Sequence, residues 1–419
     1  MRPTAEMDTS LPAASSFPHW RWNLRILWLT QAIAMAGMSA FLPFLPLYVR
    51  QLGHFSVAQA QWWGGLVIAA PFLTALVATP LWGIVADRYG RKLVLVRAAF
   101  GLGVTVFLMG LAPTVETLFL LRLLQGALSG FVAATTGFVA AETPPQRVGY
   151  ALGLLQSAAA TGSVVGPLVG GIFSDAFGMR WTFFVVGGLC IGAGIIVWRF
   201  VREQNRPRQQ SGSAWEPFRY VAHSPTVLLV LGAIVLAQAA MVLPAPIFPL
   251  YLEWLAAPRG LLSTITGISV GIAGLMMALA APLWARIAES RGSGHTLFFC
   301  TAAAAVLYLA QAFAPHYAVV VLFRALVGAA VAGVLPTLYA VLSSHAPASF
   351  RSSVMGVGSS ATLLGNLLGP LLGSVLAASL GMRWVFVAAA MLMTVLAALN
   401  PRARLLTRQL LLRAWSQRH

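Results

Sequence analysis

The sequence predicts an all-α integral membrane protein with twelve transmembrane helices in two pseudo-symmetric six-helix halves. Three observations lead to this fold class: 59% of the 419 residues are hydrophobic and only 9% are charged, the apolar runs are long and continuous, and landmarks of the first half recur in the second. So little polar surface could not cover a soluble protein of this length. A helix needs about 20 apolar residues to cross about 30 Å of hydrocarbon, so such runs favour helices over strands.

The expected helices are the apolar runs between glycines, prolines and charged residues. In the first half they lie at 24–49, 58–86, 92–111, 115–141, 148–174 and 180–202. In the second half they lie at 226–252, 263–287, 295–314, 317–343, 352–378 and 383–400. An even number of spans places both termini on the same side of the membrane.

The same pattern divides the chain into five segments. They are a cytoplasmic N-terminal tail (1–23), a first six-helix half (24–202), a cytoplasmic linker (203–225), a second six-helix half (226–400) and a basic amphipathic cytoplasmic tail (401–419). The first apolar run is too long for a signal peptide and lacks a small-residue cleavage site, so we expect it to remain as a helix. The C-terminal tail alternates arginine with leucine, which predicts a helix resting on the anionic inner leaflet.

The positive charges are distributed unevenly between the two sides of the expected bundle. The net charge of +17 would favour nucleic acid as the partner of a soluble chain, but in a membrane protein it indicates basic cytoplasmic loops. The side that holds the termini has Arg21, Arg25, Arg88, Arg91, Lys92, Arg147, Arg202, Arg206, Arg208, Arg219, Arg286, Arg291 and Arg351. The opposite side has Arg50, Arg180, Arg259 and Arg383. The asymmetry predicts cytoplasmic termini and no nucleic-acid partner.

An internal repeat is the strongest indication of the architecture, because one offset of 202 or 203 positions aligns many landmarks at once. The aligned segments are Pro43–Tyr48 with Pro246–Tyr251, Gly178–Trp181 with Gly381–Trp384, Arg122 and Gly126 with Arg324 and Gly328, and Gly166–Leu168 with Gly369–Leu371. A parallel repeat of this kind predicts a binding site near the midplane between the halves, reached alternately from each side.

Several motifs resemble those of the major facilitator superfamily, and the resemblance covers the chain apart from the termini and the linker. The turn Gly83-x-x-x-Asp87-Arg88-x-Gly90-Arg91-Lys92 is similar to the signature between helices 2 and 3 of that family. The pattern Arg122-x-x-Gln125-Gly126 in helix 4 resembles a motif of the twelve-helix drug:proton antiporter branch. The helix-5 pattern, which resembles the antiporter motif associated with exporters, comprises Gly162, Gly166, Pro167, Gly170 and Gly171. The stretch Leu42–Gly53 is similar to MdtG-type multidrug exporters.

The charged turn between helices 2 and 3 is expected to be a cytoplasmic gate. Gly83 lets another helix approach, Gly90 permits the tight turn, and Asp87 can accept hydrogen bonds from a helix N-terminus. We hypothesise that Asp87 docks near the start of helix 11 while Arg91 pairs with Glu142, which would hold the cytoplasmic side shut in the outward-open state. The alternative is a solvated pair between Asp87 and Arg91.

Arg122 lies inside an apolar run, where a buried cation is costly unless it finds acceptors or faces a cavity. The resemblance implies a part in proton transfer or in holding a polar substrate group, together with Gln125; the alternative is an arginine that extends to the interface. Arg324 occupies the matching place in helix 10 and lacks the glutamine. The helix-5 glycines are expected to permit close packing and a gating bend, although plain helix packing would need them as well.

The remaining polar groups at midplane depth are Gln31, Gln156, Gln238 and Asn366. They are expected to line a substrate cavity, although each could instead form a helix-to-helix hydrogen bond. With many aromatic residues and methionines but few fixed charges, such a cavity would favour bulky, mostly apolar molecules.

No carboxylate is expected at the midplane, where a coupled proton is usually carried. The acidic residues are Glu6, Asp8, Asp87, Glu116, Glu142, Asp175, Glu203, Glu216, Glu253 and Glu289, all expected in loops or at helix ends. Proton coupling could use Asp87 or Glu142 at the cytoplasmic side, or Asp175 or Glu253 at the outer side. The sequence does not choose between them.

These patterns favour a secondary transporter that exports bulky, largely apolar compounds by alternating access in exchange for protons. The alternative is an importer or exchanger of small organic anions bound by Arg122 and Arg324. No metal or cofactor is expected, and Cys190 and Cys300 predict no disulfide. A receptor or enzyme lacks support, because no metalloprotease or nucleophile-elbow motif is present. We expect a monomer in the bacterial inner membrane, with the bilayer, protons and a small-molecule substrate as its partners.

Overall fold

The computed structural model describes residues 18–53, 55–128, 130–204, 216–347 and 351–416. These residues form helices joined by short connections, and twelve helical segments are long and apolar enough to cross a membrane. The predicted fold class, an all-α bundle of twelve spans, is confirmed.

The helices of the first half follow one another along the chain with short connections. They are α1 (Trp20–Phe41), η2 (Leu42–Phe44), α2 (Leu45–Leu52), α3 (Val57–Tyr89), α4 (Arg91–Met109), α5 (Val115–Leu128), α6 (Phe131–Glu142), η3 (Pro145–Arg147), α7 (Val148–Phe177) and α8 (Met179–Phe200). The next are α9 (Glu216–His223), α10 (Pro225–Val242), α11 (Phe248–Trp254), η4 (Arg259–Leu261), α12 (Leu262–Arg291) and α13 (Ser293–Ala312). The last are α14 (Tyr317–Val331), α15 (Val334–His345), α16 (Arg351–Leu380) and α17 (Met382–Ser416).

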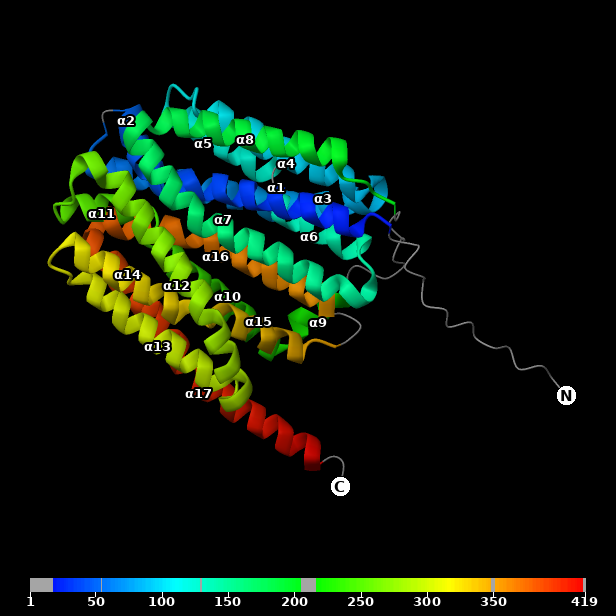
Figure 1. The fold of residues 1–419 in the computed structure, drawn as a ribbon. Helices are drawn as coiled ribbons and strands as arrows, with labels where there is room; N and C mark the ends of the chain where they lie inside the picture. Colours follow the sequence, from blue (N-terminus) through cyan, green and yellow to red (C-terminus); the bar gives the residue numbers. More distant parts are fainter. Residues whose placement is uncertain (1–17, 54, 129, 205–215, 348–350, 417–419) are drawn as a thin grey trace.

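The two halves lie side by side, with α7 and α16 running along the boundary between them (Figure 1). The short helices α2 and α11 lie together at one end of the bundle, and α9 lies at the other. Following the sequence-based prediction of sidedness, we call these the outer end and the inner end. Each half has its own cluster of buried apolar side chains, so each is a separately packed unit.

Four spans expected as single helices are interrupted, and glycine or proline stands at each break. The fourth span divides into α5 and α6 before Gly130, whose φ of +94° is a conformation that glycine adopts readily. The tenth divides into α14 and α15 near Gly333. Prolines stand at the break between α1 and α2 in the first span and between α10 and α11 in the seventh. Each proline lacks the backbone N–H that would continue the helical hydrogen bonding, so the helix is interrupted there.

Equivalent breaks in the two halves are capped by equivalent tryptophans. Trp82 Nε1 donates to the Ala127 carbonyl at 2.8 Å, and Trp284 Nε1 donates to the Ala329 carbonyl at 2.8 Å. These carbonyls lie in the last turns of α5 and α14, where the interruption removes their intrahelical donors. The internal repeat predicted from the sequence therefore extends to individual hydrogen bonds.

The helix-5 glycines lie where α7 packs tightly against α1. A methyl group on Gly162 would lie 2.6 Å from the Ala32 carbonyl oxygen, and methyl groups on Gly166 and Gly170 would collide with the carbonyls of the next turns of α1. The second half repeats this packing, because Gly365, Gly369 and Gly373 of α16 lie against α10. Small residues let two backbones approach closely in a membrane, where packing provides much of the attraction between helices.

The two halves touch at the outer end and separate toward the inner end. In α7, a methyl group on Gly171 would lie 2.5 Å from the Ser263 carbonyl of α12, whereas a methyl group on Gly153 would have no atom of another described element within 4 Å. In α3, Gly65 packs against Ser374 and Pro370 of α16, whereas Gly83 has no atom within 4 Å. Gly153 and Gly171 are five helical turns of 3.6 residues apart in α7, and Gly65 and Gly83 are five turns apart in α3. Each pair therefore lies on one face of its helix. Both pairs of crossing helices therefore diverge.

Two segments outside the spans are helical, and a helix was predicted for only one of them, the C-terminal tail. Part of the predicted linker is the helix α9, where the Tyr220 hydroxyl donates to the His345 carbonyl at 2.7 Å. The C-terminal tail continues the twelfth span as one helix, α17, as far as Ser416. The remainder of the linker (205–215) and the residues of the N-terminal tail before 18 lie outside the described residues.

The packing at Gly170 gives a first prediction. Gly170→Ala should destabilise the first half by about 1–3 kcal/mol, because its methyl group collides with the Ala40 backbone. Thermal unfolding of the purified protein in detergent measures this as a lower melting temperature. Gly188→Ala in α8 is the matched control, since nothing lies within 4 Å of that position. Equal melting temperatures for the two variants would contradict the packing.

Candidate functional site

An ion pair joins the two halves at the outer end. Arg50, at the end of α2, donates from Nη1 and Nη2 to the Glu253 carboxylate of α11 at 2.6 and 3.3 Å. Arg259 of η4 adds a third bond to the same carboxylate at 3.2 Å. Arg50 and Glu253 are 203 positions apart, so they occupy equivalent places of the internal repeat with opposite charges. The repeat thus brings a cation and an anion together where its two copies meet.

The electrostatic environment keeps Glu253 ionised. The hydrogen bond from Arg50, with the charges of Arg50 and Arg259, holds the pKa of the Glu253 carboxyl below its ordinary value. A lowered pKa means that the stabilisation is present at neutral pH and is lost only as the pH falls through that lowered value.

Asp175, near the end of α7, caps a helix of the other half. Its carboxylate accepts from the backbone N–H groups of Ser263 at 3.2 Å and Thr264 at 2.7 Å, in the first turn of α12. That helix has Leu261 at its own N-cap position, which provides no side-chain acceptor. The first N–H groups of a helix need acceptors and carry partial positive charge, so a carboxylate suits this place. The first half therefore completes a helix of the second.

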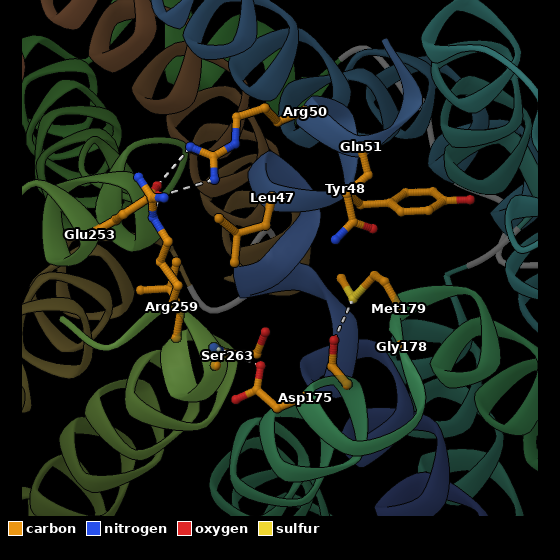
Figure 2. A pocket seen from close by; sticks show the side chains of 13 residues that line it. Leu47, Tyr48, Arg50, Gln51, Asp175, Gly178, Met179, Glu253, Arg259 and Ser263 are labelled. Carbon is orange, nitrogen blue, oxygen red and sulfur yellow. Dashed lines mark hydrogen bonds and ion pairs between the residues drawn. The ribbon is translucent and has the colours of Figure 1, made fainter. Parts of the chain in front are cut away.

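A pocket of about 550 Å³ lies at this junction (Figure 2). Figure 2 shows Arg50 and Glu253 pointing toward one another on one side of the pocket, with Asp175 near Ser263 below them. Its lining comes from both halves and includes Tyr48, Gln51, Met179 and Arg259. We call the Arg50, Arg259, Glu253 and Asp175 contacts the outer clamp.

The outer clamp stabilises the joint only modestly. The Arg50 side chain is 42% exposed, and ion pairs that water reaches contribute about 0–1 kcal/mol. A helix cap contributes about 0.5–2 kcal/mol. Together these are a few kcal/mol at most, which is the range in which a protein can exchange between two conformations.

At the inner end, the predicted gate motif is open. The Asp87 side chain is 69% exposed and its nearest cation is Arg91, 4.0 Å away. Arg88 lies on the Tyr89 ring, and Gly90 has a φ of +106° that ends α3 before α4 begins. Docking of Asp87 on the start of α16 is therefore not part of this conformation. It stays a prediction for the conformation in which the inner end closes.

The ion pair between Arg91 and Glu142, predicted for the conformation in which the inner end is shut, is not formed in this conformation and stays a prediction. Arg91 Nη1 instead donates to the Gly137 carbonyl at 3.0 Å, and Glu142 accepts from the backbone N–H of Gln204 at 3.1 Å. Glu142 is nearly buried, with 5% of its surface exposed. Both side chains bind nearby backbone groups here, one in α6 and one just after the sixth span, and these acceptors and donors cannot be recognised from charge spacing.

Glu203 caps the helix that follows the gate motif, and this contact was not predicted from the sequence. Its carboxylate accepts from the backbone N–H of Arg91 at 2.7 Å and of Lys92 at 3.0 Å, at the start of α4. Gly90 offers no side chain that could cap this helix. An acidic residue just beyond the sixth span was the available signal, because an anion is stabilised at a helix N-terminus.

Arg122 is buried, with 2% of its surface exposed, and backbone oxygens of α3 surround it. Its Nε donates to the Val67 carbonyl at 3.0 Å, and Nη1 donates to Gln125 Oε1. The Val67 carbonyl lacks its usual helical donor, because the residue four positions later is Pro71. Arg122 thus replaces the hydrogen bond that Pro71 removes, and it does not extend to the interface.

The other predicted cavity residues have different surroundings. Gln238 donates to Asn366 Oδ1 at 2.8 Å and so joins α10 to α16, which is the helix-to-helix alternative. Gln31 is buried, and its amide atoms have no hydrogen-bond partner among the described residues. Gln156 is exposed, one turn from Gly153 on α7. Arg324 is half-buried beside the Phe248 ring, 5.0 Å from its centroid. The structure brings together Arg122 with Gln125 and Gln238 with Asn366, in opposite halves.

Comparisons with known proteins agree with this geometry. The family model described as Major Facilitator Superfamily matches residues 27–274 and 244–412. The chain is 30% identical over 378 residues to the multidrug resistance protein MdtG of Yersinia enterocolitica, covering 90% of this chain and 91% of the relative. It is 32% identical over 375 residues to MdtG of Enterobacter lignolyticus, covering 89% and 90%.

Solved structures share the fold at low sequence identity. A bacterial homologue of the human lysosomal transporter Spinster, in an inward-facing and occupied conformation, has a TM-score of 0.77 at 16% identity, covering 92% of this chain and 97% of that one. The nucleoside transporter NupG has a TM-score of 0.76 at 15% identity, covering 91% and 98%.

The Arg122 contacts predict an energetic coupling with Pro71. Arg122→Gln should lower stability by about 1.5–3 kcal/mol, because hydrogen bonds from a charged donor are lost. Pro71→Ala restores an N–H for the Val67 carbonyl, so Arg122→Gln should cost clearly less in that background. Thermal unfolding of the two single variants and the double variant measures this coupling. Strictly additive changes would contradict the assigned role.

The Asp175 cap predicts that its removal opens the outer end. Ser374 is 1% exposed in the outer joint, so a Ser374→Cys variant should react slowly with a membrane-impermeant maleimide. Adding Asp175→Ala should raise that rate about 2- to 30-fold, corresponding to about 0.5–2 kcal/mol.

Labelling rates measured by mass spectrometry provide the check, since Cys190 and Cys300 are buried. Glu116→Ala is the matched control, because it removes a carboxylate from the outer end of α5 and not from the joint. If the rate did not change with Asp175→Ala, the cap would not hold the outer end closed.

Proposed function

This chain belongs to the Major Facilitator Superfamily and is a multi-pass membrane transporter, and we propose that it exports bulky, largely apolar compounds by alternating access in exchange for protons. One observation carries the proposal: the halves are joined at the outer end by contacts worth a few kcal/mol and are apart at the inner end. A transporter in this conformation receives its substrate from the inner side and releases it when the outer clamp opens.

Two features support export rather than import. The helix-5 glycines and Pro167 form the tight contacts of α7 with α1 and α12, so a change in their packing would move both halves. The MdtG relatives are multidrug resistance proteins, which suits a transporter that removes compounds from the cell. We place the protein in the bacterial inner membrane as a monomer, with both termini in the cytoplasm as the positive-inside rule indicates.

The outer clamp serves gating rather than proton carriage in this proposal. Asp175 and Glu253 are bound by N–H and guanidinium groups while the outer end is closed, so a proton they take up outside must leave before closure. Such a proton returns to the side from which it came. Asp87 and Glu142 at the inner end are the carboxylates that remain for coupling.

The alternative, transport of small organic anions between Arg122 and Arg324, is less well supported. The Arg122 guanidinium already donates to Val67 and Gln125, and 2% exposure leaves little room for a substrate. A two-arginine site would need both side chains free.

Transport in liposomes tests the proposal. With an acidic lumen, the purified protein should accumulate a neutral fluorescent lipophilic compound while an internal dye reports a rise in pH. Asp87→Asn should abolish both signals without changing expression, because residue 87 could no longer dock on the start of α16 and close the inner end.

Each outcome decides part of this. Substrate movement with no pH response would reject proton exchange, and movement of small anions alone would favour the alternative. Full activity of Asp87→Asn would contradict the role of the inner gate.

A further inference from the structure

Arg324 and Arg122 are equivalent positions of the repeat with different surroundings. Arg324 lies in the span Tyr317–His345, where its Nε and Nη1 atoms are buried and have no hydrogen-bond partner within the described ranges. Its side chain as a whole is half-buried. A buried cation without acceptors is costly in a membrane, and this cost calls for an explanation.

The missing acceptors follow from one residue difference between the halves. Gly126 packs on the Pro71 backbone in the first half, and Gly328 packs on the Ala273 backbone in the second, so Ala273 replaces Pro71. Ala273 has the N–H that proline lacks, and α12 continues through this position as a regular helix. No carbonyl of α12 is therefore released for Arg324, and its Nε and Nη1 donors have no acceptor among the described residues.

In the part of the chain that the structure describes, no group beside Arg324 neutralises its charge. The groups beside the guanidinium are the Phe248 ring and Tyr308, neither of which is anionic at neutral pH. No ion pair to Arg324 exists among the described residues, and the carboxylates within the spans lie at their ends. Among the described residues, the second half thus holds a cation in the membrane region without an anionic partner.

We propose that Arg324 binds the anionic group of the transported compound, so that the substrates are lipophilic weak acids rather than lipophilic cations. This inference rests on the proposed function and names its substrate class. The guanidinium can donate two parallel hydrogen bonds to a carboxylate. Tyr308 can donate a third, and Phe248 can pack against the apolar body. A lipophilic cation would instead meet the positive charge.

Binding of a matched pair of probes tests the site without requiring transport. The protein in detergent is titrated with 1-pyrenebutyrate and with 1-pyrenebutanol, which differ in the carboxylate, and pyrene fluorescence reports binding. The wild type should bind the carboxylate at least about tenfold more tightly than the alcohol, as hydrogen bonds to charged groups imply. Arg324→Gln should abolish that preference and leave the affinity for the alcohol unchanged.

Two further variants make the result specific. Arg324→Lys keeps the charge without the planar fork and should retain part of the preference. Arg97→Gln is the matched control, because Arg97 is also a membrane arginine but lies over Trp82, 3.5 Å from its ring centroid, in the first half. It should keep the full preference. Gel filtration confirms that each variant is folded.

Several outcomes would overturn the site: no preference for the carboxylate in the wild type, an equal loss of affinity for both probes in Arg324→Gln, or an equal loss of preference in Arg97→Gln. Failure of the proposed function is seen separately. Retained carboxylate preference with no pH-coupled movement in liposomes would reject proton-driven export and leave the binding site intact.

Discussion

The joint at the outer end determines how the rest of the molecule is arranged. Glycines bring the backbones of α7 and α12 into contact there, and Asp175 of one half completes the first turn of a helix in the other. Five turns away on the same helix faces, methyl groups on Gly153 and Gly83 would meet no atom of another described element within 4 Å. The joining interactions contribute a few kcal/mol at most. They can therefore hold the halves together at the outer end and still let that end open.

A second constraint acts inside each half, because the bilayer offers no water to satisfy polar groups. Arg122 bonds the carbonyl that Pro71 releases, and Trp82 bonds the carbonyl released at the break before Gly130. The two halves follow one internal repeat, and the positions at which they differ are informative. Arg50 faces Glu253, and with Ala273 in place of Pro71 the Nε and Nη1 atoms of Arg324 have no acceptor among the described residues. The first half uses its arginine for structure, which leaves the arginine of the second half available for a substrate.

The sequence predicted the fold class because long apolar runs and a repeat of about 200 positions depend on composition and order alone. It also placed Asp175 and Glu253 at the outer side. It did not predict the breaks in the fourth and tenth spans, which depend on local backbone geometry. The backbone partners of Arg122 and Glu203 were missed because each lies far along the chain from the side chain that it binds. The Arg50–Glu253 pair was readable in principle, since opposite charges at equivalent repeat positions meet near a pseudo-two-fold axis.

The central claim is that weak cross-half contacts close the outer end while the inner end is open. Distances between spin labels in lipid nanodiscs test it most directly, with one label pair at Val57 and Leu261 on the outer end and another at Tyr89 and Ser353 on the inner end. In a variant with Asp175→Ala and Glu253→Gln, we expect the outer distance to lengthen and the inner distance to shorten together. Unchanged outer distances, or a longer outer distance with no change at the inner end, would contradict the account.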